Sequence, residues 1–425
     1  MDNDSFEGCA LCALGLEKVL ANEIAKIGLE ASGRSPGRIF FRTDLKGLFR
    51  ANLELRTAER ILLVAARYEA PDFDALFEGA RRPAWQRFFA SEDKLVIERV
   101  RSRDSRLEAQ TSVQSVVHKA IYEALGKAYR QQRMPETGRS RSLRVYLDHD
   151  ECILGLDLSG EALHKRGWRK AAGDAPLKET VAAGILLLAG WRRRLPLLDP
   201  FCGSGTFLVE AAHFALERAP GLDRHFEIET MPLLKEGAAT IFADERQRAR
   251  AAVRKDVELR LVGSDSDPRA IEQVQGNAAR AGVAPFIEVS VAQAEDAKPY
   301  AEEGLLITNP PWGERLGTEA EARALYGRLG KAWGIVAAEG SGPRGGGQRD
   351  GGQRDSGARG KGWDERGRGR RNGGPTGRFA GWSIGVVTNA EDAGLAFGRR
   401  APVERRLQNG AEEHWIHLYP ASERG

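Results

Sequence analysis

Cysteines and long apolar segments are both scarce in this chain of 425 residues. Four cysteines are too few for a disulfide scaffold and are typical of a reducing compartment. No apolar run approaches the roughly 20 residues that a membrane-spanning helix needs. The acidic first residues lack the basic-then-apolar order of a secretory signal. These absences argue against membrane and exported proteins, and we expect a cytoplasmic protein.

Metal-ligating patterns are missing as well. Cys9 and Cys12 form a Cys-x-x-Cys pair, but no second Cys or His pair lies nearby in the sequence. We therefore predict no metal site. His213 and His225 have no obvious triad partners, which argues against hydrolase chemistry.

Positive charge is concentrated in two segments, although the whole chain carries a formal net charge of only +4. Residues 99–144 contain eleven basic and four acidic side chains, and residues 341–378 contain ten and four. This concentration predicts contact with a polyanion, although a solvated surface would have the same composition.

Residues 340–378 are rich in Gly and Arg and nearly free of apolar side chains, so we expect disorder there. The tract could contact RNA loosely or be a tolerated loop insertion.

The rest of the chain divides near residues 165–180. The first part mixes short helices and strands in an α+β pattern. We expect helices at 14–27 and 111–129, strands at 38–42 and 94–101, and a hairpin of 143–147 with 152–158.

The second part alternates strands and helices, which predicts a mostly parallel sheet with helices on both faces. An insertion at about 220–257 separates the first helix from the second strand. The turn pair Asn409-Gly410 predicts a closing antiparallel hairpin. The expected strands are 195–199, 258–265, 286–292, 304–308 and 382–388, and the expected helices are 206–217, 268–281 and 325–338.

The first of these parallel strands leads into the sequence DPFCGSGT. Asp199 and Pro200 end the strand, Gly203 and Gly205 form a turn, and Thr206 begins a helix. Ligands of open α/β sheets bind at the carboxyl ends of strands, and glycine lets backbone approach a ligand closely. No phosphate-loop or dinucleotide pattern is present. These residues are candidates for a cofactor site, and a plain tight turn is the alternative.

Acidic residues follow the next two strands. Asp265 stands at a strand tip, where a carboxylate can accept hydrogen bonds from ribose hydroxyls. Asp267 is a second candidate, although its place before Pro268 is typical of a helix cap. Glu295 could contact the adenine or sugar of a nucleoside. Asp296 is its rival, and ordinary surface charge is the alternative.

The most specific pattern is Asn309-Pro310-Pro311-Trp312, directly after the fourth strand. The two prolines stiffen the backbone. The Asn309 side-chain oxygen and the Pro310 carbonyl can then accept hydrogen bonds from a planar exocyclic amine, which makes its nitrogen a better nucleophile. Trp312 offers a stacking face for a base turned out of its helix. The alternative is a rigid loop with a core tryptophan.

DPFCGSGT and NPPWGERLG, in this order on this sheet, resemble the class I S-adenosylmethionine-dependent amino-methyltransferases. Residues 156–191, residues 309–317 and the C-terminal NGAEEHWIHLYP resemble the THUMP-domain RNA guanine-N2 methyltransferases, often labelled N6-adenine-specific DNA methylases. The members that modify large-subunit (23S) ribosomal RNA match best. The match covers nearly the whole chain except residues 340–378.

The resemblance implies three regions and one cofactor. Residues 1–60 would be a ferredoxin-like segment, and residues 61–165 a THUMP RNA-binding domain. Residues 166–425 would be a Rossmann-like, seven-stranded methyltransferase domain interrupted by 340–378. The cofactor would be S-adenosylmethionine. Residues 172–178 would close over it, with Pro176 and Leu177 near its methionine end.

The sequence departs from the family pattern at two positions. Trp312 replaces the commoner Tyr, and Glu295 replaces Asp. Three other functions stay open: a tRNA guanine-N2 methyltransferase, a DNA adenine-N6 methyltransferase, and a non-catalytic RNA-binding assembly factor. The basic first part favours RNA, with ribosomal RNA first and tRNA second.

Overall fold

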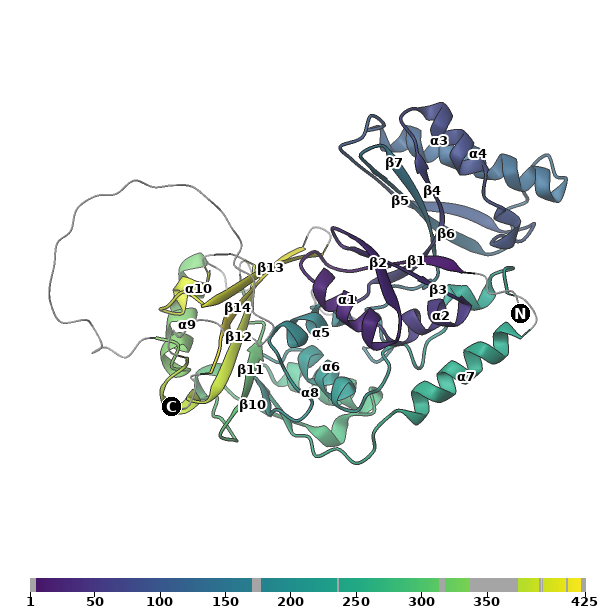
Figure 1. Cartoon of the computed structure of the whole chain (residues 1–425). Coiled ribbons are helices and arrows are strands. Elements are labelled where there is room, and N and C mark those ends of the chain that lie inside the picture. The colour runs from purple at the N-terminus through teal and green to yellow at the C-terminus, as the bar shows by residue number, and fades with distance from the viewer. Residues whose placement is uncertain are drawn as a thin grey trace, which may run out of the picture.

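Two seven-stranded sheets form the framework of the chain (Figure 1). The computed structural model describes residues 5–169, 177–234, 237–312, 318–336, 374–389, 391, 393–409 and 412–421. Within these ranges, no helix combines the length and apolar character needed to cross a bilayer. The predicted loop over the cofactor lies outside them except for Leu177 and Lys178, and Pro176 is among the residues left out.

The first sheet contains both N-terminal regions and has the order β2-β3-β1-β4-β7-β6-β5. Among the described strands of this sheet, only β5 and β6 pair in parallel. Strand β4 pairs with β1 at its start and with β7 along most of its length, so it joins strands β1–β3, where the ferredoxin-like segment is expected, to strands β5–β7, where the THUMP domain is expected. We call these the ferredoxin-like half and the THUMP half of the sheet. The strands are β1 Phe6–Leu11, β2 Glu30–Ser35, β3 Arg38–Thr43, β4 Arg60–Glu69, β5 Lys94–Arg103, β6 Ser140–Asp148 and β7 Glu151–Asp157.

Four helices belong to this first sheet. Asp44 and Asp72 cap the second and third by accepting hydrogen bonds from Gly47 and Ala75. Figure 1 shows the third and fourth together on one face of the THUMP half. The helices are α1 Glu17–Lys26, α2 Leu45–Glu54, α3 Phe73–Arg81 and α4 Gln110–Tyr129.

The second sheet confirms the predicted Rossmann-like, seven-stranded fold. Its order is β10-β9-β8-β11-β12-β14-β13. The first five strands are parallel, and the predicted closing hairpin adds β14 antiparallel to β12. The strands are β8 Leu197–Asp199, β9 Leu261–Asp265, β10 Ile287–Val291, β11 Gly304–Thr308, β12 Trp382–Thr388, β13 Val403–Asn409 and β14 Glu412–Tyr419. The helices of this second part of the chain are α5 Glu179–Leu188, α6 Thr206–Ala215, α7 Ala238–Ala251, α8 Pro268–Arg280, α9 Glu319–Ala332 and α10 Ala393–Ala396, and α7 belongs to the insertion rather than to the sheet.

The insertion predicted at 220–257 attaches the second sheet to the first. Its helix α7 runs along α2 (Figure 1), where Phe242 stacks on Phe49 with ring centroids 4.4 Å apart. Arg50 pairs with Glu245 at 2.9 Å beside this stack. The insertion and the N-terminal part share one hydrophobic core, so burial of apolar area holds them together.

Two sequence predictions differ clearly from the structure, and several other predicted ends differ by up to three residues. The helix predicted at 325–338 is Glu319–Ala332, because Thr318 and Glu321 form a capping box that starts it earlier. The predicted disorder does not extend to residues 374–378. The Thr376 N–H donates to the Gly334 carbonyl, and the Arg378 guanidinium donates to the Ala297 carbonyl. Residues 340–373 of that segment lie outside the described ranges.

Part of the positive charge of residues 99–144 is internal. Arg141 on β6 is 2% exposed and pairs with Asp93. It also reaches Glu227 at 2.7 Å and the Thr230 carbonyl at 2.9 Å, both in the insertion. This arginine therefore neutralises buried acidic groups and ties the insertion to the THUMP half.

Replacing Arg141 should destabilise the chain. Arg141→Ala leaves the buried Asp93 carboxylate without its cation, and loss of one partner of a buried pair costs about 3–5 kcal/mol. Thermal and urea unfolding should show a clear loss of stability. Arg139→Ala, at an exposed position just before the same strand, should be close to neutral. Equal stability of the two variants would contradict this role.

Candidate active site

Three strand ends meet at one edge of the second sheet. Asp199 ends β8, Asp265 ends β9 and Thr308 ends β11, and β8 lies between the other two strands. After β8 the chain continues to β9, which pairs with one side of β8, whereas the later strand β11 pairs with the other side. A crevice outside such a switch in strand order is the usual ligand site of open α/β sheets.

The glycine turn after β8 is fixed to the tip of β9. Gly203 and Gly205 have φ values of +51° and +81°, in the left-handed region that favours glycine. The Gly203 N–H donates to Asp265 Oδ2 at 3.0 Å, and Asp265 Oδ1 accepts from the Asp267 N–H at 3.0 Å. A Cβ on Gly203 would meet nothing within 4 Å, whereas one on Gly205 would lie 2.9 Å from Val274. The turn is thus open at its first glycine and packed at its second.

Asp199 is buried between the turn and β11. It is 2% exposed, and its Oδ1 accepts from the Thr308 hydroxyl at 2.7 Å and the Phe201 N–H at 3.3 Å. Burial raises the pKa of Asp199 to about 7, although the Thr308 hydrogen bond acts in the opposite direction. Thr308 directly precedes Asn309, so this carboxyl group links the glycine turn to the Asn-Pro-Pro-Trp segment.

The Asn-Pro-Pro-Trp segment forms a self-bonded corner. The Trp312 Nε1–H donates to Asn309 Oδ1 at 3.1 Å, and the Tyr326 hydroxyl donates to the Pro311 carbonyl at 3.1 Å. Pro310 is buried, and Trp312 is half-buried. The Asn309 oxygen predicted to accept from a substrate amine therefore already accepts a hydrogen bond from Trp312.

The other residues predicted to bind the cofactor lie in different environments. Asp267 caps α8 by accepting from the Arg269 N–H at 2.9 Å, as expected for Asp before Pro. Glu295 Oε1 accepts from Arg328 Nε at 3.1 Å. Pro200 and Leu177 are buried. The ligand roles of these residues stay predictions.

The sequence analysis did not identify Arg169, whose side chain donates hydrogen bonds to the glycine turn. Its guanidinium donates to Glu179 Oε1 at 2.9 Å, Ser204 Oγ at 2.6 Å and Thr206 Oγ1 at 2.9 Å. Arg169 lies more than 30 residues before the turn in the chain, so no local spacing indicates the contact. Thr308 was missed for the same reason, because only the sheet brings it to Asp199.

The geometry fits a cofactor that carries a cationic amino-acid part and a ribose. A buried carboxyl group with a raised pKa becomes fully ionised when a cation binds beside it, which suits Asp199. The Asp265 oxygens are held by backbone N–H groups and keep lone pairs for hydroxyl groups. Within the described ranges, no group of three or more His, Cys, Asp or Glu side chains could hold a metal ion.

Comparisons with known proteins identify relatives of this chain. Family models match residues 7–62 (RlmL ferredoxin-like domain), 70–157 (THUMP domain) and 166–342 (RMKL-like methyltransferase domain). A Bacillus subtilis (strain 168) protein named as an RNA methyltransferase, YpsC, is 32% identical over 94% of this chain and 92% of its own length. A solved methyltransferase, SMU.472 in complex with S-adenosylhomocysteine, is 28% identical, covers 100% of both chains and has a TM-score of 0.81.

A further relative is longer than this chain. The ribosomal RNA large subunit methyltransferase K/L of Aliivibrio fischeri (strain MJ11) is 34% identical over 76% of this chain. The match spans only 46% of that protein, so this chain corresponds to about half of it.

The fold, the glycine turn and the Asn-Pro-Pro-Trp corner define a class I S-adenosylmethionine-dependent methyltransferase. Within that class, the chain belongs to the family of RNA methyltransferases that join a ferredoxin-like segment and a THUMP domain to an RMKL-like methyltransferase domain.

The raised pKa of Asp199 predicts a pH-dependent affinity for S-adenosylmethionine. A cationic ligand favours the carboxylate, so below a pKa of about 7 binding must first remove a proton. The Kd should rise roughly tenfold between pH 8 and pH 6. Isothermal titration calorimetry over this range would measure it.

Two variants serve as references for this experiment. Asp199→Asn should bind more weakly and lose the pH dependence, whereas Asp244→Asn, exposed on α7, should keep it. A flat profile for the unsubstituted protein would show that Asp199 does not change its charge on binding.

Proposed function

We propose that the protein methylates the exocyclic N2 amine of a guanine in large-subunit ribosomal RNA. The observation that carries the proposal is the Asn309–Trp312 corner, which the Asp199–Thr308 hydrogen bond holds beside the glycine turn. The name of the K/L relative, of which this chain spans about half, supports ribosomal RNA as the substrate. We also propose the region boundaries near residues 60 and 165, and a cytoplasmic location.

The corner would orient the target amine. Bound S-adenosylmethionine supplies a methyl group on a positively charged sulfur. Asn309 Oδ1 and the Pro310 carbonyl accept from the amine N–H groups, which directs the nitrogen lone pair toward that methyl carbon. A nitrogen–carbon bond forms, the carbon–sulfur bond breaks, and the extra proton leaves the nitrogen to water. In the free protein Asn309 Oδ1 accepts from Trp312, so the incoming amine either uses the second lone pair of this oxygen or replaces the Trp312 donor.

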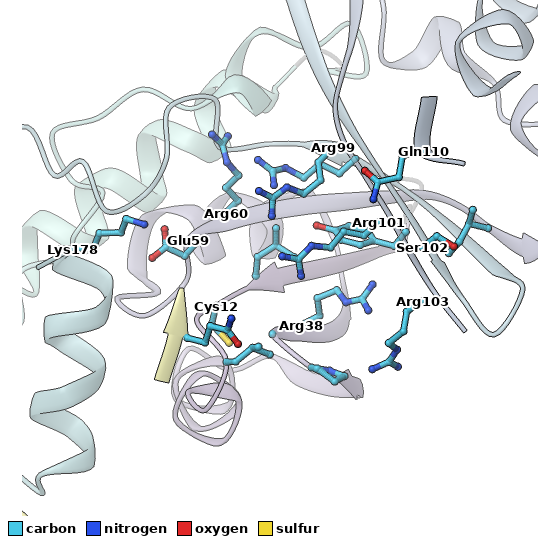
Figure 2. Close-up of a pocket in the computed structure, with 18 residues that line it drawn as sticks. Cys12, Arg38, Glu59, Arg60, Arg99, Arg101, Ser102, Arg103, Gln110 and Lys178 are labelled. Atoms are coloured by element: carbon cyan, nitrogen blue, oxygen red, sulfur yellow. The ribbon is translucent and has the colours of Figure 1, made fainter. Parts of the chain in front are cut away.

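A basic cavity of about 700 Å³ supports RNA as the substrate. Figure 2 shows arginines from several strands of the first sheet converging on it, with Lys178 of the methyltransferase part at one side. Gln408 of β13 also lines it. Its basic residues are Arg38, Arg60, Arg99, Arg101, Arg103, Arg144 and Lys178.

Two of these arginines carry unbalanced charge. Arg103 pairs with Asp148, Arg60 with Asp157 and Arg144 with Glu98. Arg99 and Arg101 have no ion pair with any residue that the structure describes. Both are exposed and alternate along β5, with buried Val100 between them pointing into the core. Two like charges on one face of a strand attract a phosphate backbone.

Asn309→Ala should separate binding from chemistry. The affinity for S-adenosylmethionine should stay nearly unchanged, whereas kcat on RNA should fall by about 100- to 1,000-fold because the amine loses its acceptor. Calorimetry and transfer of a labelled methyl group would measure the two quantities. Parallel loss of both would show that Asn309 is structural.

The substrate itself can be tested by methyl transfer to deproteinised ribosomal RNA, tRNA and duplex DNA, followed by mass spectrometry of the modified nucleosides. We expect N2-methylguanosine in large-subunit RNA. N2-methylguanosine in tRNA, N6-methyladenine in DNA, or S-adenosylmethionine binding without transfer would each replace this proposal with one of the alternatives.

Arg99→Ala/Arg101→Ala should weaken RNA binding and make it less sensitive to salt. Removing two phosphate contacts should lower the slope of log K against log salt by about 1.4 for single-stranded RNA. The double variant Arg250→Ala/Lys255→Ala removes the same charge from exposed positions elsewhere and should leave the slope unchanged. Equal slopes in all three proteins would place the RNA on another surface.

A further inference from the structure

The C-terminal hairpin brings a histidine to the Asn-Pro-Pro-Trp corner. Strand β14 is antiparallel to β12, with Trp415 opposite Thr388, so its first residues lie at the same sheet edge as Asn309. The His414 ring packs edge-on against Trp312, with ring centroids 6.4 Å apart and an angle of 77°. His414 is thus the neighbour of the side chain on which the target base would stack.

His414 is buried but incompletely hydrogen-bonded. The residue is 7% exposed, and among the residues that the structure describes its Nδ1 has no hydrogen-bond partner. The other ring nitrogen, Nε2, lies 4.0 Å from Glu412 Oε2. Buried polar atoms without partners are costly and uncommon in native proteins, so this nitrogen is a candidate acceptor for a bound ligand.

The charges around His414 define which ring nitrogen can accept. Burial lowers the pKa of His414, Glu412 acts in the opposite direction, and Lys178 lowers it further, so these surroundings favour the neutral imidazole. Lys178 lies 3.6 Å from Glu412. The Glu412 carboxylate beside Nε2 favours the tautomer with hydrogen on Nε2, which leaves Nδ1 as an acceptor.

We propose that His414 is a base-recognition residue whose Nδ1 accepts a hydrogen bond from N1–H of the target guanine. This inference rests on the proposed function. Flipped bases are read by hydrogen bonds to their Watson–Crick edge. Guanine has hydrogen on N1 and adenine does not, so an acceptor at this position selects guanine even though both bases carry an exocyclic amine.

One movement would expose both acceptors. Trp312 donates to Asn309 Oδ1 and packs against His414 in the free protein. A base that stacks on the Trp312 ring would shift this ring from its contacts with Asn309 and His414, and the shift would make both acceptors available, one to the amine and one to N1–H.

The test uses an RNA oligonucleotide containing the mapped target, made with guanine or with 2-aminopurine. 2-Aminopurine keeps the reactive amine and lacks the N1 hydrogen. His414→Ala should lower kcat/KM on guanine by roughly 10- to 100-fold, and on 2-aminopurine by less than about threefold. Affinity for S-adenosylmethionine, measured by calorimetry, confirms that each variant is folded.

Conservative variants identify the ring nitrogen. His414→Asn places an amide oxygen near the position of Nδ1 and should retain more guanine activity than His414→Gln or His414→Ala. Glu413→Gln is the matched control, since its side chain contacts Arg406 and Trp415 instead, and it should react like the unsubstituted protein with both oligonucleotides.

The outcomes separate this inference from the proposed function. If the unsubstituted protein methylates no guanine in RNA, the proposed function fails. If it does, and His414→Ala loses equal activity on guanine and 2-aminopurine, or none on either, the recognition role of His414 is overturned. A loss restricted to guanine supports it.

Discussion

The hydrogen bond between Asp199 and Thr308 is the constraint on which the site depends. It joins the end of β8 to the end of β11 within a buried environment, so it couples the position of the glycine turn to the start of the Asn-Pro-Pro-Trp corner. Methyl transfer needs donor and acceptor in line at close range, and rigid strands provide such positioning better than loops. The raised pKa of Asp199 is the electrostatic consequence of placing this link in the interior.

The N-terminal sheet and the methyltransferase domain are joined through several independent contacts. The insertion stacks Phe242 on Phe49, and the Leu14 and Gln408 backbones bond reciprocally at 2.8 and 3.1 Å. The buried Arg56 guanidinium donates to the His213 carbonyl at the end of α6. The basic cavity lies where these parts meet, because residues of the N-terminal sheet line it together with Lys178 and Gln408.

Much of the fold and the main motifs could be predicted from the sequence. Alternating strands and helices gave the second sheet, and Asp199, Asp265 and Asn309 were placed correctly at strand ends because strand tips converge by geometry. Contacts between distant segments could not be predicted. Arg169 reaches the glycine turn, Arg141 turns inward and Thr308 bonds to Asp199 only after the sheets assemble. The start of α9 was misplaced because the Thr318 capping box was overlooked.

The single strand shared by the two N-terminal regions has a consequence for substrate choice. Since β4 belongs to both, and the insertion clamps the sheet to the methyltransferase domain, the separation between the Arg99–Arg101 face and Trp312 is set by covalent and packed structure. Such a fixed separation would let the protein measure distance along its RNA. It would accept an RNA only when the anchored stretch and the reactive nucleotide are the right number of nucleotides apart, so length along the strand would be measured before the base is read.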